Sequence, residues 1–410
     1  MYDITIIGAG LAGLSLAIRL TEPKFAGLRI LVLDPRQQLQ RKEEEQGKPG
    51  NKTWCAWRRN VHPFATCVEH RWSTGLLSDT RQPVNGVVQL DFSTCPYERI
   101  TEARLVEFSI GKLAATQHIT LSLAVMVTDV TESGGYATIT SSMGNILSKL
   151  VFDSRPPTPS ARAWRQVFRG GEYTLLRNRN SYRSSGNDID TSFTMMAMTP
   201  APRGEGCRFM YELPLSQDRS LLQATAFIPP GAPTPADAVW QSMLEEYIAK
   251  RGDTVVRLDQ AEDGEIVMDP NVPALSELTT ITAIGARGGF VRAATGYSFS
   301  RAQRACDALV TAIETWQRAT IPAQALPIPI KWQSSLIGLL DRVFFEALSR
   351  EDVDTAALFW QLARGTSGDR LARFLDGEPT FRDLAVVIRS MPMLAFAKSS
   401  LHVAQHRARG

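Results

Sequence analysis

The sequence predicts an α/β protein in which a Rossmann-type nucleotide-binding fold is joined to an antiparallel-sheet lobe and a helical C-terminal cap. Three observations predict this architecture: a strand–glycine–helix pattern at the N-terminus, a strand-like middle over 166–228, and apolar residues at helical spacing from 333 onward. The length of 410 residues fits two lobes, because a domain takes roughly 100–200 residues.

The N-terminal pattern has the spacing of a dinucleotide-binding fingerprint. A β-rich run over 4–7 leads into Gly8, Gly10 and Gly13, and an apolar helical run follows. Gly8 permits the tight turn, Gly10 lets the backbone approach a pyrophosphate, and Gly13 lets the helix pack on the strand. A second apolar run ends in Asp34, about 20 residues further on, where a carboxylate accepts hydrogen bonds from ribose hydroxyls.

Later segments are predicted to return to the same nucleotide. One apolar strand ends at Asp153, another over 280–284 runs into the glycines of 285–289, and the segment 295–299 opens a helix. The motif lies at the extreme N-terminus, which is typical of FAD enzymes of the glutathione-reductase type, so FAD is the predicted cofactor. The predicted FAD-binding residues are Gly8, Gly10, Gly13, Asp34, Arg104, Asp153, Gly288, Gly289, Thr295 and Gly296.

Proline-rich segments at 156–160, 229–233 and 322–329 mark crossovers between the parts of the chain. They divide it into an FAD-binding part over 1–165, completed by about 275–320, and two further parts. The second part, 166–275, is predicted to be an antiparallel substrate lobe, and the third, 321–410, a helical cap.

The composition excludes several classes of protein. A net charge of +3 provides no basic field for nucleic acid. The five cysteines form no CxxC pair, and no histidine has zinc-site spacing to a cysteine, so neither a disulfide framework nor a metal site is expected. No apolar run reaches the roughly 18 residues of a membrane span. We expect a cytoplasmic protein in a reducing compartment.

Four further regions form a specific combination of motifs. They are Asn-Lys-Thr-Trp-Cys at 51–55, Phe-Met-Tyr-Glu-Leu-Pro-Leu-Ser at 209–216, Thr-Gly-Tyr-Ser at 295–298, and the C-terminal segments 340–345 and 373–375. With the N-terminal fingerprint, they resemble the FAD-containing lycopene β-cyclases of bacteria over nearly the whole chain.

The resemblance implies a reaction without net redox change. In that family a carboxylic acid protonates the end of a polyene, the cation closes a six-membered ring, and a proton is lost. Reduced FAD, for which NAD(P)H is the expected reductant, stabilises the passing cation electrostatically. The implied substrate is a long apolar polyene, either a carotenoid or another isoprenoid-like product.

Two segments depart from the family's pattern. Where the resemblance places an acidic pair, the chain has Gln223 and Ala224, and the family's Met-Asp-Phe segment is Met-Ala-Met at 196–198. An amide cannot act as a Brønsted acid, and removal of a positioned acid costs about 10²–10⁴ in rate. The chain is therefore either a cyclase with a relocated acid or a different enzyme on a cyclase frame.

A hairpin suggests where the relocated acid lies. If 209–215 pairs with 220–227 and Ser216 faces Arg219, then Glu212 opposes Gln223 on one sheet face. We therefore predict Glu212 as the proton donor, oriented by Gln223 and kept protonated by burial. The alternatives are a surface glutamate, or a register slip of one residue that turns Glu212 to the opposite face.

Aromatic residues beside the motifs are predicted to line an apolar tunnel and to stabilise a cation through their rings: Trp54, Tyr211, Phe227 and Tyr297. The basic, apolar segment 380–410 predicts either peripheral contact with an anionic membrane at its inner face or an ordinary helix packed on the core. Two rival functions stay open: a flavin oxidoreductase of specialised metabolism, and a catalytically inactive flavoprotein scaffold.

Overall fold

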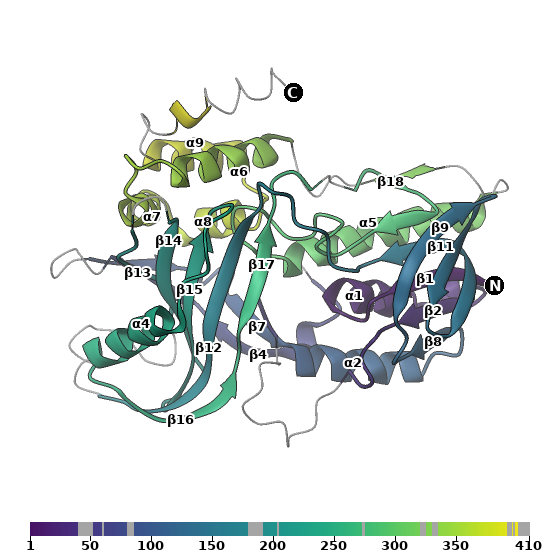
Figure 1. Ribbon diagram of the computed structural model, residues 1–410, viewed down its shortest axis with the longest axis horizontal. Helices are drawn as coiled ribbons and strands as arrows, with labels where there is room; N and C mark the ends of the chain where they lie inside the picture. The colour runs from purple at the N-terminus through teal and green to yellow at the C-terminus, as the bar shows by residue number, and fades with distance from the viewer. Residues whose placement is uncertain are drawn as a thin grey trace.

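The computed structural model describes residues 1–39, 52–59, 61–79, 86–178, 192–202, 205–272, 275–319, 325–329, 335–391, 396 and 398–400. The described chain forms an elongated molecule with two large sheets, one at each end (Figure 1). Asn51, the first residue of the motif at 51–55, lies outside the described residues.

The first sheet is the predicted Rossmann-type sheet. Its strands, in spatial order, are β8 (Ile119–Ser122), β2 (Ile30–Leu33), β1 (Tyr2–Ile7), β11 (Gly144–Asp153), β10 (Tyr136–Ser141) and β9 (Val127–Ser133), and β19 (Ile281–Ala283) also pairs with β11. From β8 through β11 to β19 the pairing is parallel. Parallel strands need cover on both faces, and Ile4 and Ile6 are accordingly fully buried.

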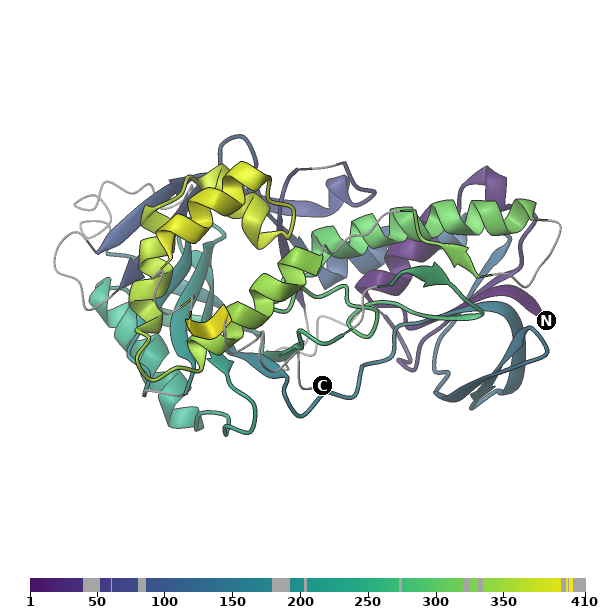
Figure 2. The ribbon, with the colours of Figure 1, turned by 90° about the horizontal axis from the view of Figure 1, so that it is seen from above.

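Helices cover this sheet and orient its glycine-rich edge. They are α1 (Leu11–Arg19), α2 (Glu102–Ala114) and α5 (Phe299–Arg318), of which α1 packs on α5 and α2. Figure 2 shows α5 running along α1. The N-termini of α1 and α5 both face the middle of the molecule, so segments nearly 300 residues apart in sequence meet at one place (Figures 1 and 2).

The second sheet is the predicted substrate lobe, and its pairing is mainly antiparallel. Its strands, in order, are β16 (Thr254–Ala261), β12 (Trp164–Leu176), β15 (Arg219–Ile228), β14 (Cys207–Pro214), β13 (Ser192–Thr199), β5 (Thr74–Asp79) and β6 (Val87–Asp91), and β17 (Gly264–Met268) also pairs with β12. The predicted division is wrong in one respect, because β5 and β6 lie within 1–165 but belong to this sheet. Long-range strand pairing of this kind leaves no local sequence signal.

Smaller elements connect the two sheets. They are the three-stranded sheet β3 (Thr53–Trp57), β7 (Tyr97–Thr101) and β4 (Val68–Trp72), the pair β18 (Glu277–Leu278) and β20 (Leu326–Pro327), and the 3-10 helices η1 (Pro23–Phe25) and η2 (Ala65–Cys67). Strand β3 carries most of the motif at 51–55 and pairs with β7 from Thr53 to Trp57. It thereby holds Thr53 and Cys55 between the two lobes.

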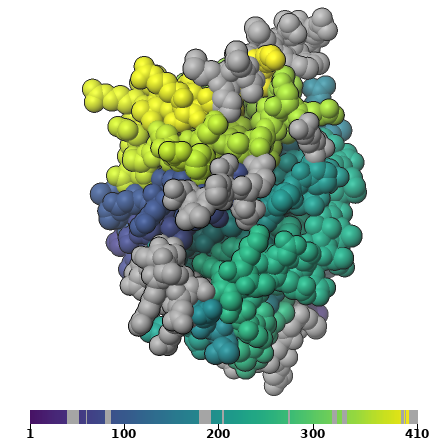
Figure 3. Space-filling model, turned by 90° about the vertical axis from the view of Figure 1, so that its left-hand side faces the viewer, coloured from purple at the N-terminus to yellow at the C-terminus, as the bar shows by residue number. Residues whose placement is uncertain are grey.

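Helices cover both faces of the second sheet. Helix α4 (Asp237–Lys250) packs on β14, β15 and β16, and the cap consists of α6 (Ser335–Leu348), α7 (Thr355–Arg364), α8 (Gly368–Leu375) and α9 (Phe381–Ser390). In Figure 3 the residues of the cap, in yellow-green and yellow, lie above the teal and green residues of this lobe. A capping box starts α9, in which Thr380 and Asp383 satisfy each other's backbone N–H groups. The cap predicted for 321–410 is present in the described residues.

The outer side of α9 carries apolar and basic residues together. Phe381 is 87% exposed and Ile388 is 50% exposed, and Arg382 and Arg389 are exposed beside them. The rest of the predicted basic segment, at 392–395, 397 and 401–410, lies outside the described residues. Among the described helices, none combines the length and the apolar character that crossing a bilayer requires.

Candidate active site

A large cavity separates the two lobes. Its volume is about 1430 Å³, and its walls come from the start of α1, the segment 295–298, the second sheet and helices α7 and α8. A pocket for one drug-sized ligand takes about 300–1,000 Å³. The cavity therefore has room for a nucleotide cofactor at the Rossmann end and for a second ligand at the sheet.

The three fingerprint glycines have different structural roles. Gly8 adopts a left-handed φ of +97°, which side chains disfavour. A Cβ on Gly13 would lie 1.8 Å from the carbonyl oxygen of Gly8, so the helix can approach the strand only without a side chain there. Gly10 has nothing within 4 Å of its Cβ position and lines the cavity. The backbone N–H groups at the start of α1 are therefore open to a phosphate group.

Asp34 is already hydrogen-bonded within the protein. Its Oδ2 accepts from the backbone N–H of Ala9 at 2.7 Å, and its Oδ1 accepts from Nε of Arg36 at 2.8 Å. These bonds hold the pKa of Asp34 below its usual value against the opposing effect of burial. Arg36, which also pairs with Glu102 at 2.9 Å, lines the cavity, and Asp34 does not. The sequence prediction missed Arg36, although it lies two residues beyond the expected acid.

Four other predicted cofactor residues do not line the cavity. Arg104 is 60% exposed in its side chain and lies 3.4 Å from Glu69. Asp153 is buried and paired with Arg155 and Arg287, both at 2.8 Å. Gly288 and Gly289 lie within the turn after β19, where a Cβ on Gly288 would clash with a backbone oxygen at 2.4 Å. Their contact with FAD stays a prediction, and in the structure these residues serve turns and ion pairs.

The turn before α5 does line the cavity as predicted. Thr295 and Gly296 both line it, together with Gly285, which the prediction passed over. Gly296 has a left-handed φ of +71°, and a Cβ there would lie 2.4 Å from Oε1 of Gln166. The helix N-terminus that follows therefore approaches the second sheet closely.

The predicted hairpin exists, but its register differs by one residue. Tyr211, and not Glu212, opposes Gln223, and Glu212 opposes Leu222. The backbone N–H groups of Leu215 and Ser216 both donate to the carbonyl of Arg219, at 2.8 and 3.1 Å. The connection is thus a three-residue loop in place of the assumed two-residue tip. One residue of slip turns every side chain to the other sheet face.

Glu212 consequently lies on the outer face of the sheet, beneath α4. It is 1% exposed and is paired with Nη1 of Arg177 at 3.1 Å and with Arg251. It also accepts hydrogen bonds from Ser220 at 2.9 Å and from Tyr247 at 2.8 Å. The catalytic prediction for Glu212 required the same face as Gln223, and the structure removes that basis. Glu212 instead anchors α4 to the sheet.

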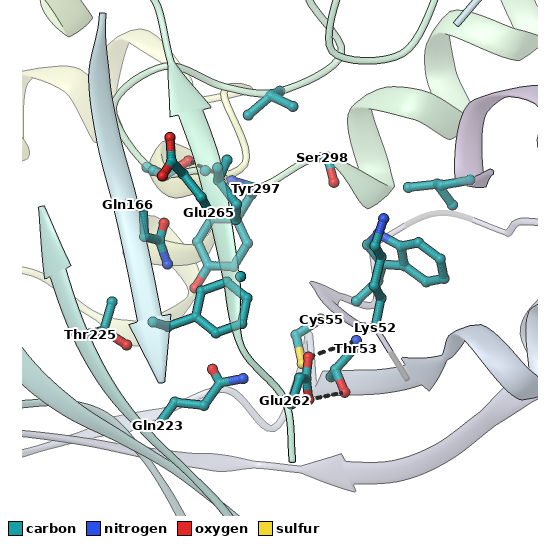
Figure 4. A pocket seen from close by; sticks show the side chains of 18 of the residues that line it. Lys52, Thr53, Cys55, Gln166, Gln223, Thr225, Glu262, Glu265, Tyr297 and Ser298 are labelled. Atoms are coloured by element: carbon teal, nitrogen blue, oxygen red, sulfur yellow. Dashed lines mark hydrogen bonds between the residues drawn. The ribbon is translucent and has the colours of Figure 1, made fainter. Parts of the chain in front are cut away.

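A different carboxyl group lies in the cavity wall. Glu262 occupies the tip between β16 and β17, is 7% exposed and lines the cavity. Thr53 donates to both carboxyl oxygens, from its backbone N–H to Oε1 and from its hydroxyl to Oε2, each at 2.9 Å (Figure 4). A guanidinium nitrogen of Arg99 lies 3.4 Å from the Thr53 hydroxyl and donates to it. Strand β3 thereby fixes the carboxyl group.

Burial controls the protonation of Glu262. Loss of water around the charged form is the main influence and raises its pKa, the bonds from Thr53 and the charge of Arg99 lower it, and nearby Glu172 raises it; together they move the pKa from 4.5 to about 7. A substantial fraction of Glu262 is therefore a neutral acid near pH 7. The sequence signal was Glu-Asp-Gly between two β-rich runs, since Asp-Gly is a strong hairpin signal.

A cluster of tyrosines adjoins this acid. The hydroxyl of Tyr211 donates to that of Tyr97, which donates to that of Tyr297, each at 3.2 Å. All three line the cavity, and burial raises their pKa values, so they stay neutral. Cys55 contacts the cluster, and burial raises its pKa to about 11. The site thus combines Glu262, one of several acidic residues in the cavity wall, with neutral aromatic rings.

The four predicted substrate-binding aromatics, Trp54, Tyr211, Phe227 and Tyr297, all line the cavity, and so does Gln223. Their contact with a substrate stays a prediction. Across the described residues, no group of three or more histidine, cysteine or acidic side chains could hold a metal ion. All five cysteines are free thiols.

Comparison with solved structures supports the fold. A geranylgeranyl bacteriochlorophyll reductase-like protein from Thermoplasma acidophilum superimposes with a TM-score of 0.59 at 9% identity, covering 97% of this chain and 98% of its own. A point variant of HpxO from Klebsiella pneumoniae, solved in complex with FAD, gives 0.58 at 13% identity, covering 96% and 100%. The Rossmann-type fold of FAD-binding flavoproteins is therefore confirmed.

Sequence comparison identifies the family. Lycopene beta-cyclase of Pantoea ananas is 25% identical over 404 residues, covering 95% of each chain. Lycopene beta-cyclase of Pseudescherichia vulneris is 24% identical over 413 residues, covering 96% of this chain and 94% of its own. The family model for lycopene cyclase proteins matches residues 3–401. The chain therefore belongs to the lycopene cyclase family.

Proposed function

We propose that this protein closes a ring on a long apolar polyene by proton transfer from Glu262, with FAD bound beside the substrate. The observation that carries the proposal is the Glu262 carboxyl group, which is buried, fixed by Thr53 and placed in the wall of the cavity. It supplies the ionisable proton that the amide of Gln223 cannot.

The Rossmann end of the cavity fits FAD. Gly10 leaves space for a close backbone approach, α1 presents its N-terminus, and Arg36 supplies a positive charge at the wall. Thr295 and Gly296 place the start of α5 at the junction with the substrate lobe. Bound FAD in its reduced state, for which NAD(P)H is the proposed reductant, supplies electron density that stabilises a nearby cation.

The protein's own residues account for the proton steps. The acid proton of Glu262 is transferred to one carbon of a terminal C=C bond, and the other carbon becomes a cation. A second double bond of the polyene attacks this cation, which forms the ring bond and moves the positive charge into the ring. Loss of a ring proton restores a C=C bond, and the Glu262 carboxylate left by the first step is available to accept it. One proton enters and one leaves, so the mass is unchanged.

Aromatic side chains are suited to the charged stage. Tyr97, Tyr211 and Tyr297 stay neutral, and their ring faces attract a cation by about 0.5–2 kcal/mol each. Trp57 packs on Tyr97 and Tyr297, each with ring centroids 4.9 Å apart, and keeps them in place. A bound polyene that fills the space between these rings would keep water, which would otherwise capture the cation, away from it.

The test is turnover by the reduced holoenzyme. Purified protein with bound flavin is reduced under anaerobic conditions and supplied with lycopene in liposomes. We expect a product of the same mass with blue-shifted absorption, and no consumption of NAD(P)H in proportion to product. A product of altered mass, formed with stoichiometric NAD(P)H consumption, would establish the rival oxidoreductase function instead.

The fingerprint glycines allow a paired test of cofactor binding. In Gly13→Ala the new Cβ meets the Gly8 carbonyl at 1.8 Å, and we expect a loss of stability of about 1–3 kcal/mol together with most of the bound flavin. In Gly10→Ala the Cβ meets nothing within 4 Å, so stability is kept and only flavin affinity falls. Thermal melts and flavin absorbance check both results. Full flavin content in Gly13→Ala would refute the assignment.

The pH dependence follows from the acid role. Because the protonated form of Glu262 is required and its pKa is about 7, kcat/KM should be level below that pH. Above it, kcat/KM should fall by about tenfold per pH unit as the carboxyl group ionises. Initial rates over a pH series that spans this value measure the profile. A rate that rises through the same range would mean that Glu262 acts as a base.

We further propose peripheral contact of the protein with an anionic membrane through α9, because Phe381 and Ile388 are exposed beside Arg382 and Arg389. Sedimentation with anionic and neutral vesicles tests this. We expect binding to anionic vesicles that weakens with salt and in Phe381→Ser. If wild type and Phe381→Ser sediment equally with anionic vesicles, α9 does not form the membrane contact.

A further inference from the structure

A band of polar side chains crosses the sheet wall of the cavity. Gln223 and Thr225 alternate on β15, and Gln166 lies on the neighbouring strand β12, opposite Phe227. All three side chains line the cavity, and Figure 4 shows them on the two adjacent strands. Apolar residues such as Phe209 line the wall beside them, and Glu265 on β17 lines it as well.

These polar groups lack partners among the described residues. Gln223 is 9% exposed and Thr225 is 1% exposed, yet neither side chain takes part in a hydrogen bond within the described chain. Oε1 of Gln166 is also buried and unpaired there. Buried polar groups in proteins are hydrogen-bonded in the large majority of cases, so an unpaired group facing a cavity indicates a partner that arrives with the ligand.

A pure hydrocarbon would make these groups costly. When it fills the cavity it displaces water from the polar atoms of Gln223 and Thr225, leaves the buried Oε1 of Gln166 unpaired, and offers no hydrogen bond in return. A ligand with an oxygen atom at the band satisfies them. Amide and hydroxyl groups both donate and accept, so they fit a hydroxyl or a carbonyl oxygen. Because all three side chains are uncharged, the matching group is neutral as well.

We infer that the substrate is an oxygen-bearing polyene, with a hydroxyl or keto group that hydrogen-bonds to Gln166, Gln223 and Thr225. This inference rests on the proposed function for the nature of the carbon chain and adds a polar group to it. The inference also gives a reason for the amide of Gln223, because an amide can hydrogen-bond to a neutral oxygen atom of the substrate without introducing a buried charge.

Equilibrium binding to the oxidised holoenzyme tests the inference without turnover. The probes are geranylgeraniol and the hydrocarbon of the same carbon skeleton that lacks the hydroxyl group, each presented in the same detergent. Quenching of protein or flavin fluorescence gives the two dissociation constants. Their ratio is compared between wild type and variants, so the unequal partition of the probes into detergent cancels.

The decisive variant combines Gln223→Met with Thr225→Val, which keeps the side-chain size and removes the hydrogen-bonding groups. We expect the preference for the alcohol to fall by at least about tenfold, because a site built for a hydroxyl discriminates strongly against the analogue without it. Thr225→Ser keeps the hydroxyl and should keep most of the preference. Melting temperatures and flavin content establish that each variant is folded.

Two results would overturn the inference: a preference that changes less than twofold in the double variant, or a wild-type holoenzyme that binds neither probe. Failure of the proposed function gives a different pattern. In that case the alcohol preference and its loss in the double variant persist, but no same-mass cyclic product forms from any polyene. The opposite pattern is rapid cyclisation of a hydrocarbon together with a preference for the alcohol that is the same in wild type and double variant. That result would support the proposed function and refute the oxygen-bearing substrate.

Discussion

Glu262→Gln should lower the rate of ring closure by about 10²–10⁴ while leaving fold and flavin content unchanged, because it removes the proton and little else. The amide is nearly the same size and can still accept hydrogen bonds from Thr53 through its oxygen. Single-turnover rates with the reduced holoenzyme measure the loss. In this variant the fall of kcat/KM above the pKa of Glu262 should also disappear.

The matched control is Glu265→Gln. Glu265 stands on the same hairpin, but its side chain is 45% exposed and lies 3.5 Å from Arg165. Glu265 also lines the cavity, but Thr53 does not hold its carboxyl group, so the rate of the Glu265→Gln variant should change far less. Equal losses in the two variants would assign the effect to the hairpin as a whole. Full activity in Glu262→Gln would end the proposed role of this acid.

Glu212→Gln should have the opposite signature: a large loss of stability with little effect on the rate per folded molecule. The substitution leaves the guanidinium groups of Arg177 and Arg251 beside a neutral amide under α4. Removing one partner of a buried ion pair costs roughly 3–5 kcal/mol. Denaturant unfolding measures this loss, and turnover well below the melting temperature measures the rate.

The two substitutions should therefore have opposite effects: Glu262→Gln lowers the rate and keeps stability, and Glu212→Gln lowers stability and keeps the rate. A Glu212→Gln protein of wild-type stability that had lost turnover would return Glu212 to the catalytic site and contradict the observed hairpin register. Retained stability together with retained turnover would mean that the ion pairs beneath α4 contribute little net energy, which is known for other buried pairs replaced by neutral groups.

The parts of the fold that were predicted correctly depend on local sequence. The fingerprint at Gly8, Gly10 and Gly13 defines a strand, a turn and a helix within about 20 residues, and steric contact explains the glycines at 8 and 13. The strand-like middle and helical cap likewise follow from periodicity. The placement of β5 and β6 could not be predicted, because β13, the partner of β5, is far away in sequence.

The site was harder to predict because it depends on register and on contacts between lobes. A hairpin loop of three residues in place of two moved Glu212 to the outer face and brought Tyr211 opposite Gln223. Glu262 becomes significant only when β3 brings Thr53 against it across a sequence separation of 209 residues. The position of Asp34 was predicted correctly, but its role was not evident from sequence. Its carboxylate is hydrogen-bonded to Arg36 within the protein, and Arg36 is the residue that lines the cavity.

The most direct measurement of the central claim is turnover of a polyene in D₂O by the reduced wild-type enzyme, with mass spectrometry of the product. The carbon that receives the proton differs from the carbon that loses one. Proton-initiated closure therefore predicts one deuterium retained per ring, none in residual substrate, and deuterium incorporation that is slower by about 10²–10⁴ in Glu262→Gln. A cyclic product without deuterium, or one that carries added oxygen, would contradict the account.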